Sequence, residues 1–543
     1  MPVISKALLV YTDPYYLVKQ VYPYGLDLLA DRLRQEGVVV QIAYPFLPGT
    51  DPAANLAEAV ADFVPDMVGL GIRNIDTSMA CETYGDWSGN GYRTFFFLPR
   101  VRAVVDALRV LLPGVPMVCG GGAFTVASRQ ILDYLELDLG VVGDGEEALS
   151  AFVHAWPEPS RLARVPGLVM RRDGIFSQTP RRPFVFPRPH TPPRDPGFRH
   201  ALAAAGLPVR VKRGCNQGCS FCAEPVIEGR NFIHRDIDDV MAELQAAADL
   251  ETVDKIFFVD TEFNLPDLGY ATALVQHLVT DGWHRRFRFA SQFLPRPFTD
   301  DFARLLAQAG FSVILTCTSF ADPVLEAAKV SYRQADIANA LDLCARYGID
   351  VTVDLIFGLP GETRETVDHS LQCMHRWLPN PLRRYEYTVG ARIYPGTPLA
   401  RRVGAGDGRN VYGPLTPGLL EPCFYCEPGP PLDLKRQVDH RAPAPMRFDN
   451  EMTESCRARL AVGYLADRDR IAEACETFLA LELTDKSAVF DDLFRRLADT
   501  GRLDAARRVA EDLRAAIAAS SHPAYQGQAG VVDHYLALLQ RVS

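Results

Sequence analysis

The chain has 543 residues, of which 48% are hydrophobic and 23% charged, a balance typical of a globular protein and not of a disordered or fibrous one. A chain of this length is expected to form several domains. Its net charge of −10 and its lack of a basic block argue against a nucleic-acid-binding surface, which favours a small-molecule partner. Because no run of about 18 uncharged apolar residues occurs, we expect a cytoplasmic protein without a membrane span.

Residues 1–156 alternate strand-like and helix-like patterns. Near-continuous apolar runs separated by amphipathic segments predict a parallel sheet covered on both faces, which is a Rossmann-like module. Its ligand should lie beyond the carboxyl ends of the strands, where GIRNID, CGGGAFT and VGDGEE fall. The expected strands are 7–13, 38–45, 66–74, 116–122 and 138–147, and the expected helices are 24–35, 53–64, 98–112 and 126–135.

Residues 157–206 are proline-rich and are expected to form a linker, with a β-hairpin at 167–179 around an Asp173-Gly174 turn. The strand and helix alternation resumes in 207–430, where six β/α units predict a partial (β/α)6 barrel with its chemistry at the carboxyl ends of the strands. Residues 431–543 show helical patterns without a convincing repeat, and a small helical domain that caps the barrel is expected.

Three cysteines, Cys215, Cys219 and Cys222, follow the first barrel strand with the spacing C-x3-C-x2-C. Zinc would need a fourth ligand at short spacing, but the next histidine is His234 and the next cysteine is Cys317. An iron–sulfur cluster with three thiolate ligands and one open iron suits this count better, and a purely structural loop is the third alternative. A second pair, Cys423 and Cys426, has a spacing that could bind a metal, but no further pair lies nearby, so packing in a strand or loop is the favoured alternative.

Two further segments at the ends of barrel strands form motifs of their own, in addition to the cysteine loop. They are VDTEFN (259–264) at the end of the second barrel strand and LIFGLPGET (355–363) at the end of the fifth, and Phe221 precedes the third cysteine. Together these motifs resemble those of the radical S-adenosylmethionine (SAM) superfamily. The resemblance implies that the three cysteines bind a [4Fe-4S] cluster whose fourth iron is chelated by SAM. It also implies that the glycine-rich segment lies against the adenine moiety, through Gly358, Pro360, Gly361 and Glu362.

Glu262 has two functional interpretations and one structural one. Its carboxylate either accepts a hydrogen bond from the SAM ammonium group or reaches the open iron itself. Alternatively it is a charged strand end that caps the next helix. Asp260 would serve the same roles less well, because strand alternation places it on the same side but deeper.

A Rossmann-like module before such a barrel resembles the cobalamin-dependent branch of the superfamily, although a flavodoxin-like module would show the same pattern. No histidine occurs in residues 1–153, so the D-x-H-x-x-G motif that supplies a lower cobalt ligand is absent. Cobalamin would therefore bind base-off, with Arg73 a candidate for the lower face of the corrin or else a surface arginine. Asn74 and Asp76 would bind the corrin amides or cap the following segment. The residues expected to line the nucleotide tail are Gly120, Gly121, Gly122, Gly143, Gly145 and Glu146.

The resemblance implies an enzyme in which one SAM methylates cobalamin and methylcobalamin then methylates a carbon of a small molecule in natural-product biosynthesis. The branch without the histidine includes a tryptophan C2-methyltransferase, which makes C2 of tryptophan a candidate; radical and polar transfer both stay open. A cobalamin-binding radical cyclase or rearranging enzyme is the second hypothesis, and a non-catalytic sensor is the third. We expect a monomer that uses an external low-potential electron donor, without a nucleic acid or membrane partner.

Four more residues are candidates near the substrate. Arg392 and Tyr394 alternate onto one face of the last barrel strand, where Tyr394 would act as a base or a hydrogen-bond donor or would simply pack. Lys329 and Tyr332 follow the helix after the fourth strand and could approach SAM or substrate.

Overall fold

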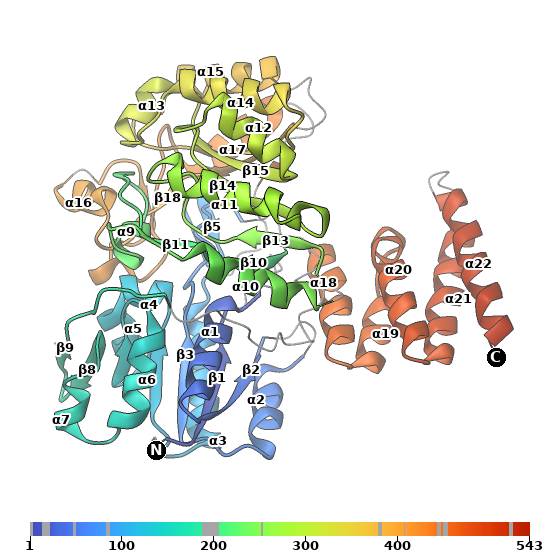
Figure 1. Cartoon of the computed structure of the whole chain (residues 1–543), viewed down its shortest axis with the longest axis horizontal. Coiled ribbons are helices and arrows are strands. Elements are labelled where there is room, and N and C mark those ends of the chain that lie inside the picture. Colours follow the sequence, from blue (N-terminus) through green and yellow to red (C-terminus); the bar gives the residue numbers. More distant parts are fainter. Residues whose placement is uncertain are drawn as a thin grey trace.

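In the computed structural model two seven-stranded sheets lie one above the other, each covered by helices (Figure 1). This confirms the predicted α/β architecture. Among the described residues, none of the helices combines the length and the apolar character needed to cross a membrane. The structure describes residues 4–13, 22–46, 50–82, 87–186, 206–250, 253–377, 383–406, 408–442, 447–448, 454–520 and 525–542.

The N-terminal sheet has the strand order β2-β1-β3-β6-β7-β8-β9, and its first five members are parallel. All five predicted strands and all four predicted helices are present, because the apolar runs are buried and the helices cover them. The strands are β1 (Lys6–Tyr11), β2 (Val39–Ala43), β3 (Met67–Gly71), β6 (Met117–Gly120) and β7 (Leu139–Val141), and the helices are α1 (Tyr24–Gln35), α2 (Pro52–Ala61), α3 (Leu98–Leu111) and α5 (Ser128–Leu135). Two further helices follow β6 and β7, namely α4 (Gly122–Val126) and α6 (Gly145–Ala155).

The predicted hairpin is present as β8 (Leu168–Arg172) and β9 (Ile175–Gln178). Asp173 and Gly174 both have positive φ angles, 51° and 74°, as a two-residue type I′ turn requires. Strand β8 pairs antiparallel with β7, so the hairpin extends the N-terminal sheet and is not part of a free linker. Most of the rest of the expected linker, 187–205, lies outside the described residues.

The second sheet has its strands in sequence order, β10-β13-β14-β15-β16-β17-β21, and all of them are parallel. Right-handed crossovers between neighbouring strands place the helices on one face and leave the other face as an interior. The described strands form an open sheet with β10 and β21 at its edges, which matches a partial barrel with one strand more than predicted. The strands are β10 (Leu207–Val209), β13 (Lys255–Phe258), β14 (Arg288–Phe293), β15 (Phe311–Thr318), β16 (Val351–Phe357), β17 (Arg383–Val389) and β21 (Arg447–Phe448).

Helices follow the barrel strands, as the six predicted β/α units require, and a small three-stranded sheet follows the last long strand. The helices are α10 (Ile237–Ala248), α11 (Leu268–Thr280), α12 (Asp300–Gln308), α14 (Gln334–Arg346) and α15 (Arg364–Trp377), with the additional α13 (Asp322–Ala327), α16 (Pro398–Gly404) and α17 (Pro431–Arg441). The small sheet consists of β18 (Ala391–Arg392), β20 (Phe424–Tyr425) and β19 (Val411–Tyr412).

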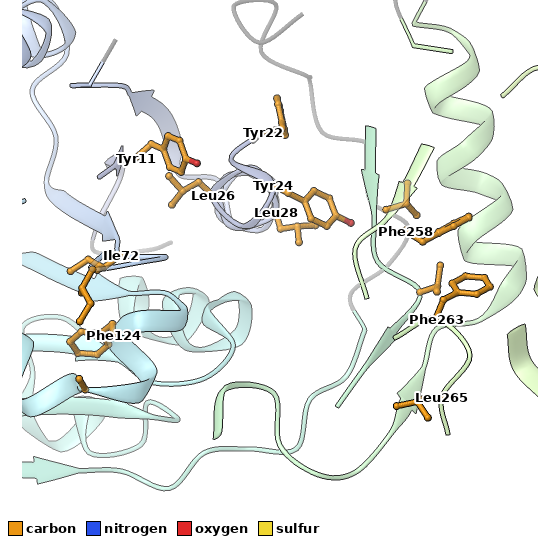
Figure 2. Packing of buried hydrophobic residues seen from close by; sticks show 14 of the residues in the cluster. Tyr11, Tyr22, Tyr24, Leu26, Leu28, Ile72, Phe124, Phe258, Phe263 and Leu265 are labelled. Atoms are coloured by element: carbon orange, nitrogen blue, oxygen red, sulfur yellow. The ribbon is translucent and has the colours of Figure 1, made fainter. Parts of the chain in front are cut away.

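One hydrophobic core runs through both sheets. Helix α1 lies between them, with Leu26 toward the N-terminal sheet and Tyr24 toward the barrel strands (Figure 2). The Tyr24 hydroxyl accepts a hydrogen bond from the backbone N–H of Arg210, which follows β10, at 3.2 Å. A hairpin of β4 (Trp87–Gly89) and β5 (Tyr92–Thr94) adds a second junction, because Leu432 N donates to Gly91 O at 2.9 Å. The two modules are therefore packed as one body.

The C-terminal helices form a separate core and extend away beside the body (Figure 1). They rest on the N-terminal module, where the Arg468 guanidinium lies 3.9 Å from the Tyr44 ring centroid and Arg470 donates to Asn55 at 3.1 Å. The expectation that they cap the barrel is therefore wrong. The helices are α18 (Glu454–Asp467), α19 (Ile471–Leu479), α20 (Leu483–Asp499), α21 (Leu503–Ala519) and α22 (Gln526–Val542).

These helices also contain a repeat that the sequence analysis missed. The segment LADRDRIAEA (465–474) recurs as LADTGRLDAA (497–506), and each copy forms the turn between two antiparallel helices. Both turns need a residue with positive φ, which Asp469 (57°) and Gly501 (72°) supply. Helix α18 packs on α19 and α20, and α20 packs on α21, so the module is a stack of helix pairs.

Candidate functional site

The three-cysteine loop lies between β11 (Lys212–Arg213) and α9 (Glu224–Ile227). Gly214 begins it with φ 98°, and a Cβ at this position would lie 2.1 Å from Asn231 O, so only glycine fits. Ser220 ties the loop to the barrel from two sides, because its N–H donates to Ala328 O and its carbonyl accepts from Leu399 N, both at 2.8 Å. The loop is thus a fixed part of the barrel rim.

The thiolate forms of the three cysteines are unfavourable unless a cation lies beside them. Burial raises the pKa of Cys215, of Cys219 (to about 12) and of Cys222, and the neighbouring thiols add to the rise for Cys219 and Cys222. In the described parts of the chain, no three His, Cys, Asp or Glu side chains converge on a single metal ion. A four-iron cluster instead needs thiolates further apart, since each binds a different iron, and its positive charge stabilises them. The loop fits such a cluster.

Glu262 follows β13 with a left-handed backbone, φ 55°. Its Oε2 atom is buried without a hydrogen-bond partner, and the same holds for Thr316 Oγ1. Burial raises the pKa of Glu262 to about 7, while Thr316 and Lys212 oppose the rise. Glu262 in turn raises the pKa of Cys215 and Cys219, so it lies beside the cysteine loop. A carboxylate with one buried oxygen left without a partner is suited to a cationic ligand at this place.

Thr316 lies at an irregularity of the barrel, since the pairing of β15 with β16 shifts register between Thr316 and Thr318. Such a bulge re-aims side chains at the end of a strand. The sequence analysis did not single out Thr316, and an isolated threonine at a strand end gave no signal.

Asp260 has a different role from the one considered for it. Its carboxylate accepts hydrogen bonds from the backbone N–H groups of Val211 and Lys212, at 3.0 and 2.8 Å. The Lys212 ammonium donates to the carbonyl of Thr261. Asp260 therefore holds the backbone at the start of the cysteine loop.

The glycine-rich segment forms a tight turn after β16. Gly358 and Gly361 have φ angles of 91° and 85°, and Pro360 is buried between them. The buried Glu362 turns back into the loop, where Oε2 accepts from Gly358 N at 3.2 Å and Oε1 accepts from the Thr366 hydroxyl at 2.7 Å. Its carboxylate is therefore used within the loop, where it helps to fix the turn.

The glycines of CGGGAFT serve the protein backbone. A Cβ at Gly121 would lie 2.4 Å from Ile72 O, and one at Gly122 would lie 3.4 Å from Arg73 O. Ala123 N donates to Arg73 O at 3.0 Å, so these glycines let the ends of β3 and β6 meet. At Gly120 the nearest atom to an added Cβ is Val141 O, at 3.8 Å.

The VGDGEE glycines lie at the end of β7, beside a small open hollow of about 40 Å³. Asp144, Glu146, Arg181 and Phe184 are among its lining residues. Gly143 has φ 83°, and Gly145 packs so closely that a Cβ would lie 2.9 Å from Leu29. Glu146 faces the barrel and lies 3.8 Å from the Arg210 guanidinium.

Arg73 and Asn74 lie together at the end of β3, and both turn toward Asp13 at the end of β1. Arg73 is half-exposed with its guanidinium 3.5 Å from Asp13 Oδ2, and Asn74 donates to the same atom at 3.4 Å. Sequence reasoning missed Asp13, although an acidic residue at the end of an apolar strand was a usable signal. Burial raises the pKa of Glu224 to about 7, Glu228 adds to the rise, and Arg213 and Arg73 oppose it.

Comparisons with known proteins agree with this geometry. Residues 209–374 match the model of the radical SAM superfamily. The chain contains a radical SAM domain. It is 25% identical to the tryptophan 2-C-methyltransferase of Streptomyces laurentii, over 78% of this chain and 80% of that protein. It is also 29% identical to a tRNA-2-methylthio-N(6)-dimethylallyladenosine synthase of Mycobacteroides abscessus, over 39% and 43% of the two chains.

Two solved structures share this fold over most or all of the chain. The methyltransferase TsrM from Kitasatospora setae, solved with cobalamin and a [4Fe-4S] cluster, superposes with a TM-score of 0.69 at 22% identity, over 87% of this chain and 99% of that one. The cobalamin-dependent radical enzyme OxsB superposes with a TM-score of 0.64 at 14% identity, over 100% and 84%. The arrangement of a Rossmann-like module on a radical SAM domain is thus shared.

Two residues expected to act in catalysis or cofactor binding instead join the radical SAM domain to the N-terminal module. Arg392 is buried, and its Nε donates to Asp76 Oδ2 at 2.8 Å. Its remaining N–H groups donate to carbonyl oxygens, including Ile393 O at 2.7 Å. The structure therefore gives no support to a catalytic Arg392 or a corrin-binding Asp76, because each is the other's partner.

The other candidate residues of the barrel, Tyr394, Tyr332 and Lys329, lie in three different places. The Tyr394 hydroxyl forms a hydrogen bond with the Ser78 hydroxyl, so it too lies at the module junction. Tyr332 is buried and donates to Thr316 O at 2.9 Å, which makes it a support for the Thr316 strand end. Lys329 is exposed and next to the cysteine loop, since Gly218 lies against its carbonyl.

Proposed function

We propose that the chain is a cobalamin- and [4Fe-4S]-dependent SAM methyltransferase that methylates a carbon of a small molecule, with tryptophan as the first substrate to test. The observation that carries the proposal is the contact between α9, which follows Cys222, and α4, which follows the glycine run of the N-terminal module. A Cβ at Gly122 would lie 3.7 Å from Ile227 Cδ1. A cluster on the cysteine loop and a ligand at the strand ends would therefore be neighbours.

The residues present suit each cofactor. Cys215, Cys219 and Cys222 would bind three irons of the cluster, and Glu262 would accept a hydrogen bond from the SAM ammonium group. Gly358, Pro360, Gly361 and Glu362 would form the backbone wall beside the adenine moiety.

The N-terminal module has no histidine before His154, so its cobalamin would have no histidine below the cobalt. Arg73 and Asn74 would face the corrin from the end of β3. Gly143, Gly145 and Glu146, which follow β7, would lie along the nucleotide tail.

When bound, cobalamin supplies a carrier for the methyl group between SAM and substrate. The chain contributes alignment, because the cysteine loop, the Glu262 strand end and the Arg73 strand end are fixed to one another by packing. Since a guanidinium does not ligate cobalt, Arg73 would contact the cofactor without becoming a metal ligand. We further propose that the protein works as a monomer in the cytoplasm, a reducing compartment that suits thiolate ligands, with an external low-potential electron donor.

The test is anaerobic reconstitution with iron, sulfide and hydroxocobalamin, then incubation with SAM, tryptophan and a low-potential reductant. Mass spectrometry should show methyltryptophan, and Cys219→Ala should lack both the cluster and the product. Product without 5′-deoxyadenosine would indicate polar transfer. Deoxyadenosine with a product of unchanged mass would replace the proposal by a cyclase or rearranging enzyme. A chain that binds neither cluster nor cobalamin would refute it.

A further inference from the structure

The segment Phe424–Glu427, here called the brace, lies against the glycine-rich loop 358–362 and contains Cys426, the second cysteine of the C-x2-C pair. Glu427 contacts both ends of the loop. Its N–H donates to Gly358 O at 3.1 Å, and its Oε2 accepts from Gly361 N at 3.2 Å. One residue thus holds both the carbonyl and the N–H that define the turn.

Cys426 fills the space beside the same turn. Its side chain is fully buried, and a Cβ at Gly358 would lie 2.7 Å from its sulfur. Burial raises the pKa of its thiol, so Cys426 is a neutral packing group at the back of the loop. Cys423 is equally buried and donates to Gly413 O at 3.8 Å. Both cysteines of the pair therefore pack, as expected.

The brace is itself held in place. The Tyr425 hydroxyl donates to Glu427 Oε2 at 2.6 Å, so this oxygen receives two hydrogen bonds, one from a side chain and one from the loop. Cys426 N donates to Asn410 O at 2.9 Å, which ties the brace to the neighbouring β19 loop. The Glu427 carboxylate thus has a fixed position before any ligand arrives.

We propose that Glu427 is a positioning residue that pre-organises the glycine-rich loop for SAM. The inference rests on the proposed function, because it assigns SAM to this loop. A loop that binds through its backbone loses affinity when the turn loosens, since the ligand must then order it. Glu427 acts through the loop and does not itself touch the reacting atoms.

The experiment measures the SAM dissociation constant of the reconstituted protein by anaerobic equilibrium dialysis. Glu427→Ala should weaken SAM binding roughly tenfold, the value of one charged hydrogen bond. Glu427→Gln keeps an acceptor and should change it about two- to threefold, and Tyr425→Phe should have a similar small effect. Glu421→Gln changes a charge just before the brace in the chain and should bind SAM like the wild type.

Iron and cobalamin contents should be unchanged in all variants, and with substrate the KM for SAM should rise while kcat at saturating SAM does not. Wild-type SAM affinity in Glu427→Ala would overturn the proposed positioning role of Glu427 and leave the methyltransferase proposal intact. No SAM binding by the wild type would overturn the methyltransferase proposal instead. If Glu427→Ala does not fold, wild-type affinity in both Glu427→Gln and Tyr425→Phe would overturn the brace.

Discussion

The Asp76–Arg392 pair should be a strong link between the two modules, and Asp76→Asn tests this. The side chains are 0% and 1% exposed and 2.8 Å apart. Removing one charge of a buried pair costs about 3–5 kcal/mol, because the other charge stays in a medium of low polarity. Since Asn keeps one acceptor for the Arg392 Nε, we expect the lower end, about 3 kcal/mol, or roughly a hundredfold in the opening equilibrium of the junction.

Hydrogen exchange measured by mass spectrometry reads this opening directly, in peptides that cover 75–82 and 390–394. The matched control is Asp254→Asn, which breaks the Arg288–Asp254 pair at 2.6 Å with 71% and 59% of the side chains exposed. An exposed pair contributes about 1 kcal/mol or less, so its peptides should exchange almost as before. Equal, small effects of the two substitutions would refute the reasoning that burial sets the strength of the junction.

Three further outcomes are expected. Between pH 5 and pH 8 the stability of Glu362→Gln relative to the wild type should rise by at most about 3 kcal/mol. Burial raises the pKa of Glu362 to about 7, so the folded wild type loses stability as this carboxyl ionises. A difference in urea midpoint between the two proteins that does not change with pH would contradict this. The affinity for SAM, measured by dialysis, should increase between pH 6 and pH 8, because the pKa of Glu262 is also raised to about 7 and its carboxyl ionises in this range. Glu262→Gln should abolish this pH dependence. An equal pH dependence of SAM affinity in the variant would count against the role of Glu262. Leu497 is fully buried in the C-terminal core, so Leu497→Ala should destabilise that module by about 2–5 kcal/mol. Limited proteolysis should show the loss of stability, and an iron assay should show an unchanged iron content. Protease resistance equal to that of the wild type would exclude a tightly packed module.

The sequence alone determined the local features of this protein. Apolar runs and amphipathic periods predicted the strands and helices of both sheets, because these patterns act over a few residues. The spacing of Cys215, Cys219 and Cys222 depends on one short loop and is likewise read directly. The glycines at 358 and 361 were also visible, since positive φ is a property of a single residue.

Only the tertiary structure decided the partners of the polar side chains. Asp76 and Arg392 are 316 residues apart in sequence, and no local pattern announces that they pair. Strand alternation placed Arg392 on the face of Tyr394 but could not tell a barrel interior from a module junction. The helical repeat, the Thr316 bulge and the contacts of Glu427 also depend on which surfaces are pressed together. Burial and pairing are set by packing between distant segments, so they appear only once the chain has folded.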